Sequence, residues 1–125
     1  MKIYTEVRPW GRFEKFHENK VSTVKLIYIK PNHRLSLQYH IHRNEFWRII
    51  SGTAQVEIDG QTFSVKEGDN VSIGSKSHHR IKAMTSGCTV LEISYGRFDE
   101  DDIVRIEDDF NRTGPSTARP ATKYK

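Results

Sequence analysis

Four side chains of types that bind metal ions lie within eight residues, at the start of an apolar segment. They are Gln38, His40, His42 and Glu45, and a further histidine, His79, follows later in the chain. Imidazole nitrogens, a carboxylate and an amide oxygen form a borderline-to-hard donor set, which suits zinc, manganese, iron, cobalt or nickel better than magnesium. We therefore expect one divalent metal ion, of undetermined identity, in an enzyme that acts on small molecules.

Strand geometry predicts how these donors converge. Residues i, i+2 and i+4 of a strand share one face, so Ser36, Gln38 and His40 point the same way. If this face and the Glu45 face of the next strand both point inward, Gln38, His40 and Glu45 meet near the turn between the strands. His79, at the start of another strand, completes four ligands and leaves room for one or two substrate oxygens. On spacing alone, a group of unrelated surface histidines is an equally good interpretation.

The rest of the body predicts short β-strands joined by tight turns. Eight strands and no convincing long helix predict an all-β, antiparallel sandwich or barrel. Asp59-Gly60 is typical of a two-residue type I′ hairpin turn, and only the acidic segment Asp101–Phe110 could form a helical turn or two. The expected strands are Val24–Ile29, Leu35–His40, Glu45–Ile50, Ala54–Ile58, Gln61–Val65, Asn70–Ile73, His79–Met84 and Thr89–Tyr95, the last two separated by a turn at Thr85–Gly87.

Length and composition set further bounds. The 125 residues correspond to one domain, assigned to residues 1–112, and the basic tail 113–125 should be disordered. The net charge is +4 and the tail supplies three of these charges, so the domain lacks a nucleic-acid-binding surface. No apolar run approaches the ~20 residues that span a bilayer, and because the first ten residues contain no apolar h-region we expect that they are not a signal peptide. A single cysteine, Cys88, excludes an intramolecular disulfide and agrees with a cytoplasmic location.

The spacing of the donors resembles that of the cupin superfamily. In cupins, two ligands one residue apart precede a glutamate and a glycine, and a second motif supplies the last histidine. The resemblance implies a cupin-type antiparallel β-barrel or jelly roll, with a glutamine in place of the usual first histidine ligand. His42 then falls outside the pattern, and we expect it to form hydrogen bonds instead. The matching segments are Gln38-x-His40-x4-Glu45-x6-Gly52 and Gly68–Arg80, which contains His79.

A second set of segments narrows the resemblance. They are Arg8–Gly11, Val24–Lys25, Leu35–Trp47, Ser51–Ala54, Leu91–Ile93, Glu100–Arg105, Asp108–Asp109 and Arg112. In this combination the chain resembles the type II mannose-6-phosphate isomerase domain, the C-terminal module of bifunctional mannose-1-phosphate guanylyltransferase/mannose-6-phosphate isomerase enzymes. The chain departs from the usual family pattern at Asn32, Gly74, Lys76 and Ala83. These departures leave the metal ligands intact; the first three change turn residues, and Ala83 removes a polar group near the barrel mouth.

The narrower resemblance implies a metal-dependent aldose–ketose isomerase that converts mannose 6-phosphate to fructose 6-phosphate through an enediol(ate). Such a reaction needs a base that carries a proton between two carbons. Glu92 is the candidate base, because a carboxylate within the apolar segment VLEIS requires a polar cavity. An outward position on the solvent face is equally compatible. Lys25, within VKLIYI, has the same ambiguity and could hold the phosphate or carry a proton.

A phosphate dianion needs cationic and hydrogen-bonding partners. The candidate substrate-binding residues are Arg8, Ser36, His42, Arg43 and Arg80, although each arginine alone is also compatible with an ordinary ion pair. Alternative functions are a non-catalytic cupin that binds sugar or metal, an epimerase and a dioxygenase. A homodimer is expected because Met1–Val7 alternates well enough to add a strand to a neighbouring copy. The alternative is an edge strand folded back on its own sheet.

Overall fold

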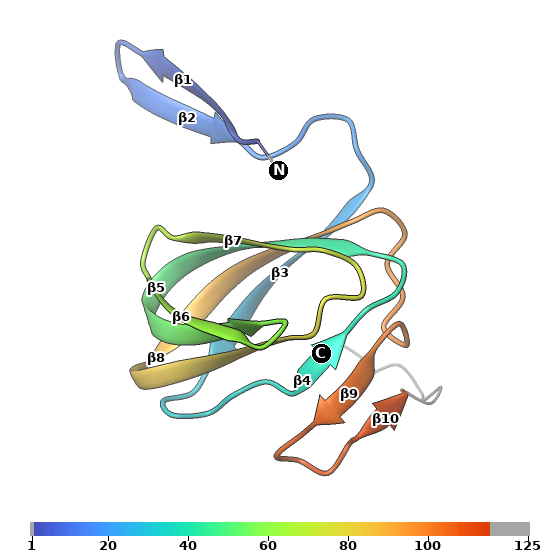
Figure 1. Ribbon diagram of the computed structural model, residues 1–125. Helices are drawn as coiled ribbons and strands as arrows, with labels where there is room; N and C mark the ends of the chain where they lie inside the picture. The colour runs from blue at the N-terminus through green and yellow to red at the C-terminus, as the bar shows by residue number, and fades with distance from the viewer. Residues whose placement is uncertain (1, 116–125) are drawn as a thin grey trace, which may run out of the picture.

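The computed structural model describes residues 2–115, which form ten β-strands and no helix (Figure 1). The all-β prediction is therefore confirmed. Because the described residues contain no long apolar helix, they contain no helical membrane span, and the predicted cytoplasmic location stays a prediction. The strands are β1 (Tyr4–Arg8), β2 (Gly11–Lys15), β3 (Ser22–Ile29), β4 (Leu37–Tyr39), β5 (Asn44–Ile58), β6 (Gln61–Lys66), β7 (Asn70–Ile73), β8 (His79–Tyr95), β9 (Val104–Glu107) and β10 (Gly114–Pro115).

Two long antiparallel strands, β5 and β8, organise the main sheet. They pair along almost their full lengths, and β3 pairs with the second half of β8. β7 and β6 pair with successive parts of β5. β4 pairs with the first residue of β8, and β9 pairs with the other side of β4. The sheet curls on itself without closing, so that one face of β5 and β8 lies inside (Figure 1).

A bend at two glycines lets each long strand serve both halves of the curled sheet. Gly52 in β5 has a φ of 82°, and Gly87 in β8 has a φ of 75°. A Cβ atom at position 52 would lie 2.1 Å from the carbonyl oxygen of Gly87, so the close approach requires glycine. The predicted turn at Thr85–Gly87 was wrong, because β8 runs through this point, as β5 does through Gly52.

The interior changes from apolar to polar along the inward faces of β5 and β8. Ile49 and Ile81 are at most 1% exposed and belong to the apolar half. The same alternation places Glu45, His79 and Glu92 inside the other half, where all three are buried. Buried ionisable side chains need partners or ligands, so this polar end of the sheet is the candidate site.

The acidic segment Asp101–Phe110 forms turns and a strand, so the helical turn predicted from its composition was wrong. Its central residues form β9, which pairs antiparallel with β4. β4 is short, and this pairing provides partners for backbone groups that would otherwise lack them. The tertiary contact therefore overrides the local helix preference.

The predicted start of the disordered tail was also wrong. Gly114–Pro115, inside the predicted tail, form β10 and pair with β9. The remainder of the tail, residues 116–125, lies outside the described part of the chain.

β1 and β2 form a separate hairpin that projects from the curled sheet (Figure 1). The expected N-terminal strand is thus paired with β2 and does not extend the main sheet. Contacts of Glu14 and Phe16 attach the base of the hairpin. The carboxylate of Glu14 accepts hydrogen bonds from Arg48 at 3.0 and 3.1 Å, and Phe16 packs on Phe46 with 5.5 Å between ring centroids.

Replacing Gly52 by alanine should destabilise the protein more than replacing Gly60. Both residues have a positive φ, 82° and 84°, but a Cβ atom at position 60 has no neighbour within 4 Å. Each alanine adds backbone strain of about 1 kcal/mol, and the clash with Gly87 should add at least ~2 kcal/mol for Gly52→Ala. Urea denaturation measures both losses, and equal losses would contradict the close approach of β5 and β8.

Candidate metal centre

His40, Glu45 and His79 meet inside the polar half of the sheet. His40 follows β4, Glu45 lies near the start of β5, and His79 begins β8. The Nε2 atoms of both histidines lie 3.5 Å from Oε1 of Glu45, and the three side chains are at most 2% exposed. These separations are long for hydrogen bonds but match the ~3.4 Å between ligand atoms that ~2.1 Å bonds impose in a tetrahedral metal site.

Two atoms of this cluster are buried without a hydrogen-bond partner. Within residues 2–115, Oε1 of Glu45 and Nε2 of His79 have none. Leaving a polar atom buried and unsatisfied costs about 1–3 kcal/mol, and more for a charged group. A divalent cation would satisfy both atoms and neutralise the carboxylate, so the residues present fit a metal ion.

Backbone carbonyl groups orient both imidazole rings. Nδ1 of His40 donates a hydrogen bond to the carbonyl oxygen of Asp102 at 2.6 Å, and Nδ1 of His79 donates to that of Ser77 at 2.9 Å. A carbonyl oxygen only accepts, so the proton of each neutral ring sits on Nδ1 and the Nε2 lone pair faces Glu45. Metal-binding histidines are held in this way, with the second ring nitrogen bonded to an outer partner.

Gln38 lies next to the cluster and presents its amide nitrogen to it. This Nε2 atom is 3.5 Å from Nε2 of His40, and the amide oxygen accepts a hydrogen bond from Oγ of Ser36 at 2.5 Å. Half a turn of the amide group exchanges its oxygen and nitrogen, which would direct the oxygen at the cluster and make Ser36 the acceptor. Gln38 as the fourth ligand stays a prediction, and the buried Ser36 is placed to orient it.

The two oxygens of Glu45 have different surroundings. Oε2 accepts hydrogen bonds from Nε of Arg43 at 3.0 Å and from Oγ of Ser94 at 3.3 Å. Arg43 is itself held by the carbonyl oxygen of Asp99, to which Nη1 donates at 3.0 Å. The carboxylate is thereby fixed with Oε1 toward the two imidazoles.

Glu92 lies on the inward face of β8, so the solvent-facing position that the sequence left open does not occur. It is opposite Lys25 of β3 and Trp47 of β5 in the sheet register. Nε1 of Trp47 donates a hydrogen bond to Oε2 of Glu92 at 3.0 Å, and the carboxylate is buried. Within residues 2–115, the indole of Trp47 is the donor that orients the group, and it leaves the other oxygen open to a ligand.

The buried carboxylates Glu45 and Glu92 have opposite pKa shifts. Burial raises the pKa of Glu92, and the charge of Glu45 adds to this, against smaller opposing effects of Trp47 and nearby cations. Burial also disfavours the charged form of Glu45, but the two imidazoles in their protonated form, which donate to it, and the charge of Arg43 outweigh burial and lower the pKa of this group. The charged form is therefore favoured at Glu45, and the protonated form is favoured at Glu92.

The connection between β8 and β9, residues 96–103, contacts the site, because it carries the carbonyl groups that accept from His40 and Arg43. The ring centroid of Phe98 lies 4.5 Å from Nζ of Lys25 and 4.5 Å from Cζ of Arg43. Nζ of Lys25 is also 3.3 Å from the carboxylate of Glu100. Two cations that the sequence singled out are thus gathered around one aromatic ring at this end of the sheet.

Three predicted substrate-binding residues lie away from this arrangement. Arg8 is on the projecting hairpin, where it pairs with Glu6. Arg80 directly follows the ligand His79 in β8, so its side chain lies on the opposite, outer face of the strand. There it donates a hydrogen bond to the carboxylate of Glu107 at 2.9 Å. His42 is exposed on the turn after β4, and its backbone N–H forms a hydrogen bond. These three residues are near the ligand motifs in the sequence, but their side chains are not near the cluster in the structure.

Sequence reasoning missed four residues that contact the site: Ser94, Phe98, Asp99 and Asp102. Two of them act through backbone carbonyl groups, which every residue carries, so no side-chain pattern marks them. The acidic run that contains them was used for the family resemblance and for a possible helical turn, and no site role was assigned to it. Ser94 carries a signal in principle, because it alternates with Glu92 on one face of β8.

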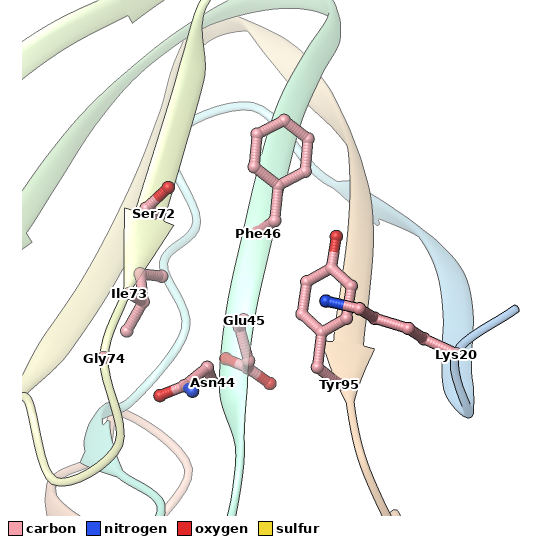
Figure 2. Close-up of a pocket in the computed structure, with 8 residues that line it drawn as sticks. All are labelled: Lys20, Asn44, Glu45, Phe46, Ser72, Ile73, Gly74 and Tyr95. Carbon is pink, nitrogen blue, oxygen red and sulfur yellow. The ribbon is translucent and has the colours of Figure 1, made fainter. Parts of the chain in front are cut away.

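A cavity of about 400 Å³ lies behind the cluster, on the outer face of β5. Asn44 and Phe46 line it (Figure 2). They alternate with Glu45 along β5, so they lie on the face of the strand opposite Glu45. Lys20 and Tyr95 lie along its other side (Figure 2). The cavity therefore backs onto Glu45 but does not open on the two histidines.

The fold and the ligand set together define a class of protein. An antiparallel sheet curled into an open jelly roll, with two histidines and a glutamate inside one end, is a cupin. Oxalate decarboxylase from Bacillus subtilis has a similar solved structure, with a TM-score of 0.63 and 27% sequence identity over 70% of this chain and 24% of that chain.

Within this class, the chain belongs to the family of mannose-6-phosphate isomerase C-terminal domains, which matches residues 1–108. The alginate biosynthesis protein AlgA of Pseudomonas aeruginosa is 41% identical over 108 residues, which are 85% of this chain and 22% of that protein. A mannose-1-phosphate guanylyltransferase of Escherichia coli is 38% identical over 109 residues, 84% of this chain and 23% of that protein. The chain thus spans less than a quarter of the length of these relatives, and the resemblance inferred from the sequence is confirmed.

The protein should bind one divalent metal ion per chain, and His79→Ala should weaken binding by about 100-fold or more, because it removes one of three rigidly held donors. Calorimetric titration with Zn²⁺ and Mn²⁺ in competition with a chelator measures the affinity. His33→Ala is the matched control, since His33 is exposed and donates to the carbonyl oxygen of Pro31. An affinity that His79→Ala leaves unchanged would show that the cluster is not the metal site.

The raised pKa of Glu92 predicts how the stability of the metal-free protein depends on pH. Folded Glu92 keeps its proton to a higher pH than the unfolded chain, where its pKa is about 4.5. Its contribution to stability is therefore complete below this pKa and is lost as the pH rises through the folded pKa. Glu92→Gln removes that loss.

The free energy of unfolding of Glu92→Gln, relative to the wild type, should therefore rise as the pH increases above 4.5. The rise should reach up to ~1.4 kcal/mol per pH unit, and urea denaturation over a pH series measures it. A difference that stays constant with pH would mean that Glu92 ionises as it does in the unfolded chain.

Proposed function

We propose that the chain is a metal-dependent aldose–ketose isomerase domain that interconverts mannose 6-phosphate and fructose 6-phosphate. The observation that carries this proposal is a pair of buried carboxylates inside one end of the sheet, Glu45 at 3.5 Å from two imidazole nitrogens and Glu92 held by the indole of Trp47. One stays ionised beside two imidazoles, and the other can hold a proton. Proton transfer next to a carbonyl group uses both kinds of carboxylate, and membership of the isomerase family supports a sugar-phosphate substrate.

The chain's own residues would move the proton. Glu92 would take it from C2 of mannose 6-phosphate and return it to C1, through an enediolate of the sugar. The indole N–H of Trp47 holds Oε2 of Glu92 and leaves Oε1 for this transfer. A divalent ion in the four predicted ligands, whether zinc, manganese, iron, cobalt or nickel, would supply Lewis-acid stabilisation of charge on O1 and O2.

Lys25 and Arg43 are the cations placed to bind the phosphate. Both lie against the ring of Phe98, on the side of the sheet that carries Glu92. The pair between Lys25 and Glu100 is exposed, and such pairs contribute little stability, so a phosphate dianion can displace it. We do not assign Arg8 or Arg80 to this role, because each contacts a carboxylate away from the cluster.

Metal-loaded protein incubated with mannose 6-phosphate in D₂O should form fructose 6-phosphate with deuterium at C1. Glu92→Gln should lower kcat by about 10²- to 10⁴-fold, because the amide cannot accept the proton. Its metal affinity should stay unchanged, since Glu92 is not a ligand. NMR of the product and a coupled kinetic assay measure both effects.

Glu57→Gln serves as the matched control for this experiment, because Glu57 lies on the outer face of the same sheet. Full activity in Glu92→Gln would remove its assignment as the base. Full turnover by metal-stripped protein would contradict the requirement for a metal.

A non-catalytic module that binds metal or sugar is the second candidate function. The enclosure of the site favours it, since the three ligands are at most 3% exposed and both nearby cations already have partners. Binding of mannose 6-phosphate without product or deuterium uptake would support this alternative over the isomerase.

We also propose a homodimer that forms through the N-terminal hairpin. An isolated two-stranded hairpin is marginally stable, and Val7 and Trp10 at its tip are 79% and 73% exposed. Within the described residues, β3 pairs with β8 along one edge only. Its outward face exposes Val24, Leu26 and Tyr28. An apolar stripe beside an open strand edge is a surface that a second copy can cover.

Light scattering should give twice the chain mass of 14.6 kDa. Changing Val7 and Trp10 to lysine should produce a monomer with unchanged metal affinity, because both residues lie on the hairpin and away from the ligands. A monomeric wild-type protein, or a dimer that survives both changes, would contradict the assignment.

A further inference from the structure

Asp102 makes three hydrogen bonds to the segment that carries the first histidine ligand. Its carboxylate oxygens accept from the backbone N–H groups of Ile41 and His42, at 2.8 and 2.9 Å. Its own carbonyl oxygen accepts from Nδ1 of His40 at 2.6 Å. One residue of the connection 96–103 thus holds both the backbone after His40 and the imidazole ring itself.

The two histidines of the cluster differ in how they are anchored. His79 lies in the long paired strand β8, and its Nδ1 donates to the carbonyl oxygen of Ser77, two residues earlier. His40 follows β4, a strand of three residues, and the chain leaves regular structure there. Its orientation comes instead from a residue 62 positions later in the chain.

We propose that Asp102 is a positioning residue that fixes the orientation and tautomer of His40, and thereby the affinity of the metal centre. Its side chain matters because the carboxylate clamps two successive N–H groups and so holds the carbonyl oxygen at the distance that Nδ1–H needs. Without the clamp, the ring can turn and place its proton on Nε2, which removes the lone pair that faces Glu45. The effect on the metal rests on the proposed metal-binding function, whereas the effect on the tautomer does not.

The test uses the full chain with nitrogen-15-labelled histidine, compared as wild type, Asp102→Asn and Asp108→Asn. The asparagine at position 102 can accept from one N–H group but turns an N–H₂ group toward the other. Asp108→Asn is the matched control, because Asp108 also accepts from two backbone N–H groups, those of Phe110 and Arg112, but does so after β9.

Long-range NMR correlations in the metal-free protein report which nitrogen of each ring carries the proton. We expect the Nδ1–H tautomer for both His40 and His79 in the wild type and in Asp108→Asn. In Asp102→Asn, His40 should populate the Nε2–H tautomer while His79 stays unchanged, which makes His79 a control within the same molecule. Competition titration with Zn²⁺ should then show an affinity about 10- to 100-fold weaker for Asp102→Asn alone.

Either of two results would overturn the proposal. One is an Nε2–H tautomer of His40 in the wild type, which needs no variant and so does not depend on whether Asp102→Asn folds. The other is a folded Asp102→Asn with wild-type tautomers and Zn²⁺ affinity. A wild type that binds no Zn²⁺ but whose His40 tautomer changes in Asp102→Asn would contradict the proposed metal function and leave the positioning role standing.

Discussion

The site depends on keeping one buried carboxylate ionised. Burial alone would favour the protonated form of Glu45, and the surrounding groups reverse this preference. Arg43 and Ser94 hold one carboxylate oxygen, and the other faces two imidazole nitrogens at 3.5 Å. One oxygen therefore accepts fixed hydrogen bonds, and the other keeps a lone pair available for a metal ion. The remaining contacts of the site preserve this difference between the two oxygens.

The two long strands position this cluster through their packing against each other. β5 and β8 carry the apolar core and the polar cluster on the same inward faces, so the packing of one half positions the other. The close approach at Gly52 and Gly87 bends both strands, which lets two strands contribute to both halves of the sheet. β4 is too short to hold its ligand alone, and β9 with the connection 96–103 completes the support.

Alternation and turn chemistry made much of this structure predictable. The inward positions of His40, Glu45 and His79 follow from period-two faces, and Glu92 follows from a charge inside an apolar strand. The turn at Asp59-Gly60 is confirmed, with φ values of 48° and 84° at its two residues and strands paired on both sides. Each of these inferences needs only neighbours in the sequence, which is why the sequence was sufficient for them.

The errors concern backbone groups of distant segments. Composition allowed a helical turn in Asp101–Phe110, but the central residues of this segment form a strand because they pair with the edge of β4. Thr85–Gly87 has turn residues, yet Gly87 serves the approach of β5 and no turn forms. Asp102 was missed because its carbonyl group, common to all residues, is what orients His40. Partners of this kind are decided by tertiary contacts, which a single sequence does not display.

X-ray absorption spectroscopy of Zn²⁺-loaded protein tests the central claim most directly. The claim is that the carboxylate, two imidazoles and the predicted amide oxygen surround one ion. The spectrum should show nitrogen and oxygen neighbours at about 2.0–2.2 Å, together with the outer-shell scattering of two imidazole rings. A first shell of oxygen alone without imidazole scattering, or a sulfur neighbour, would contradict it.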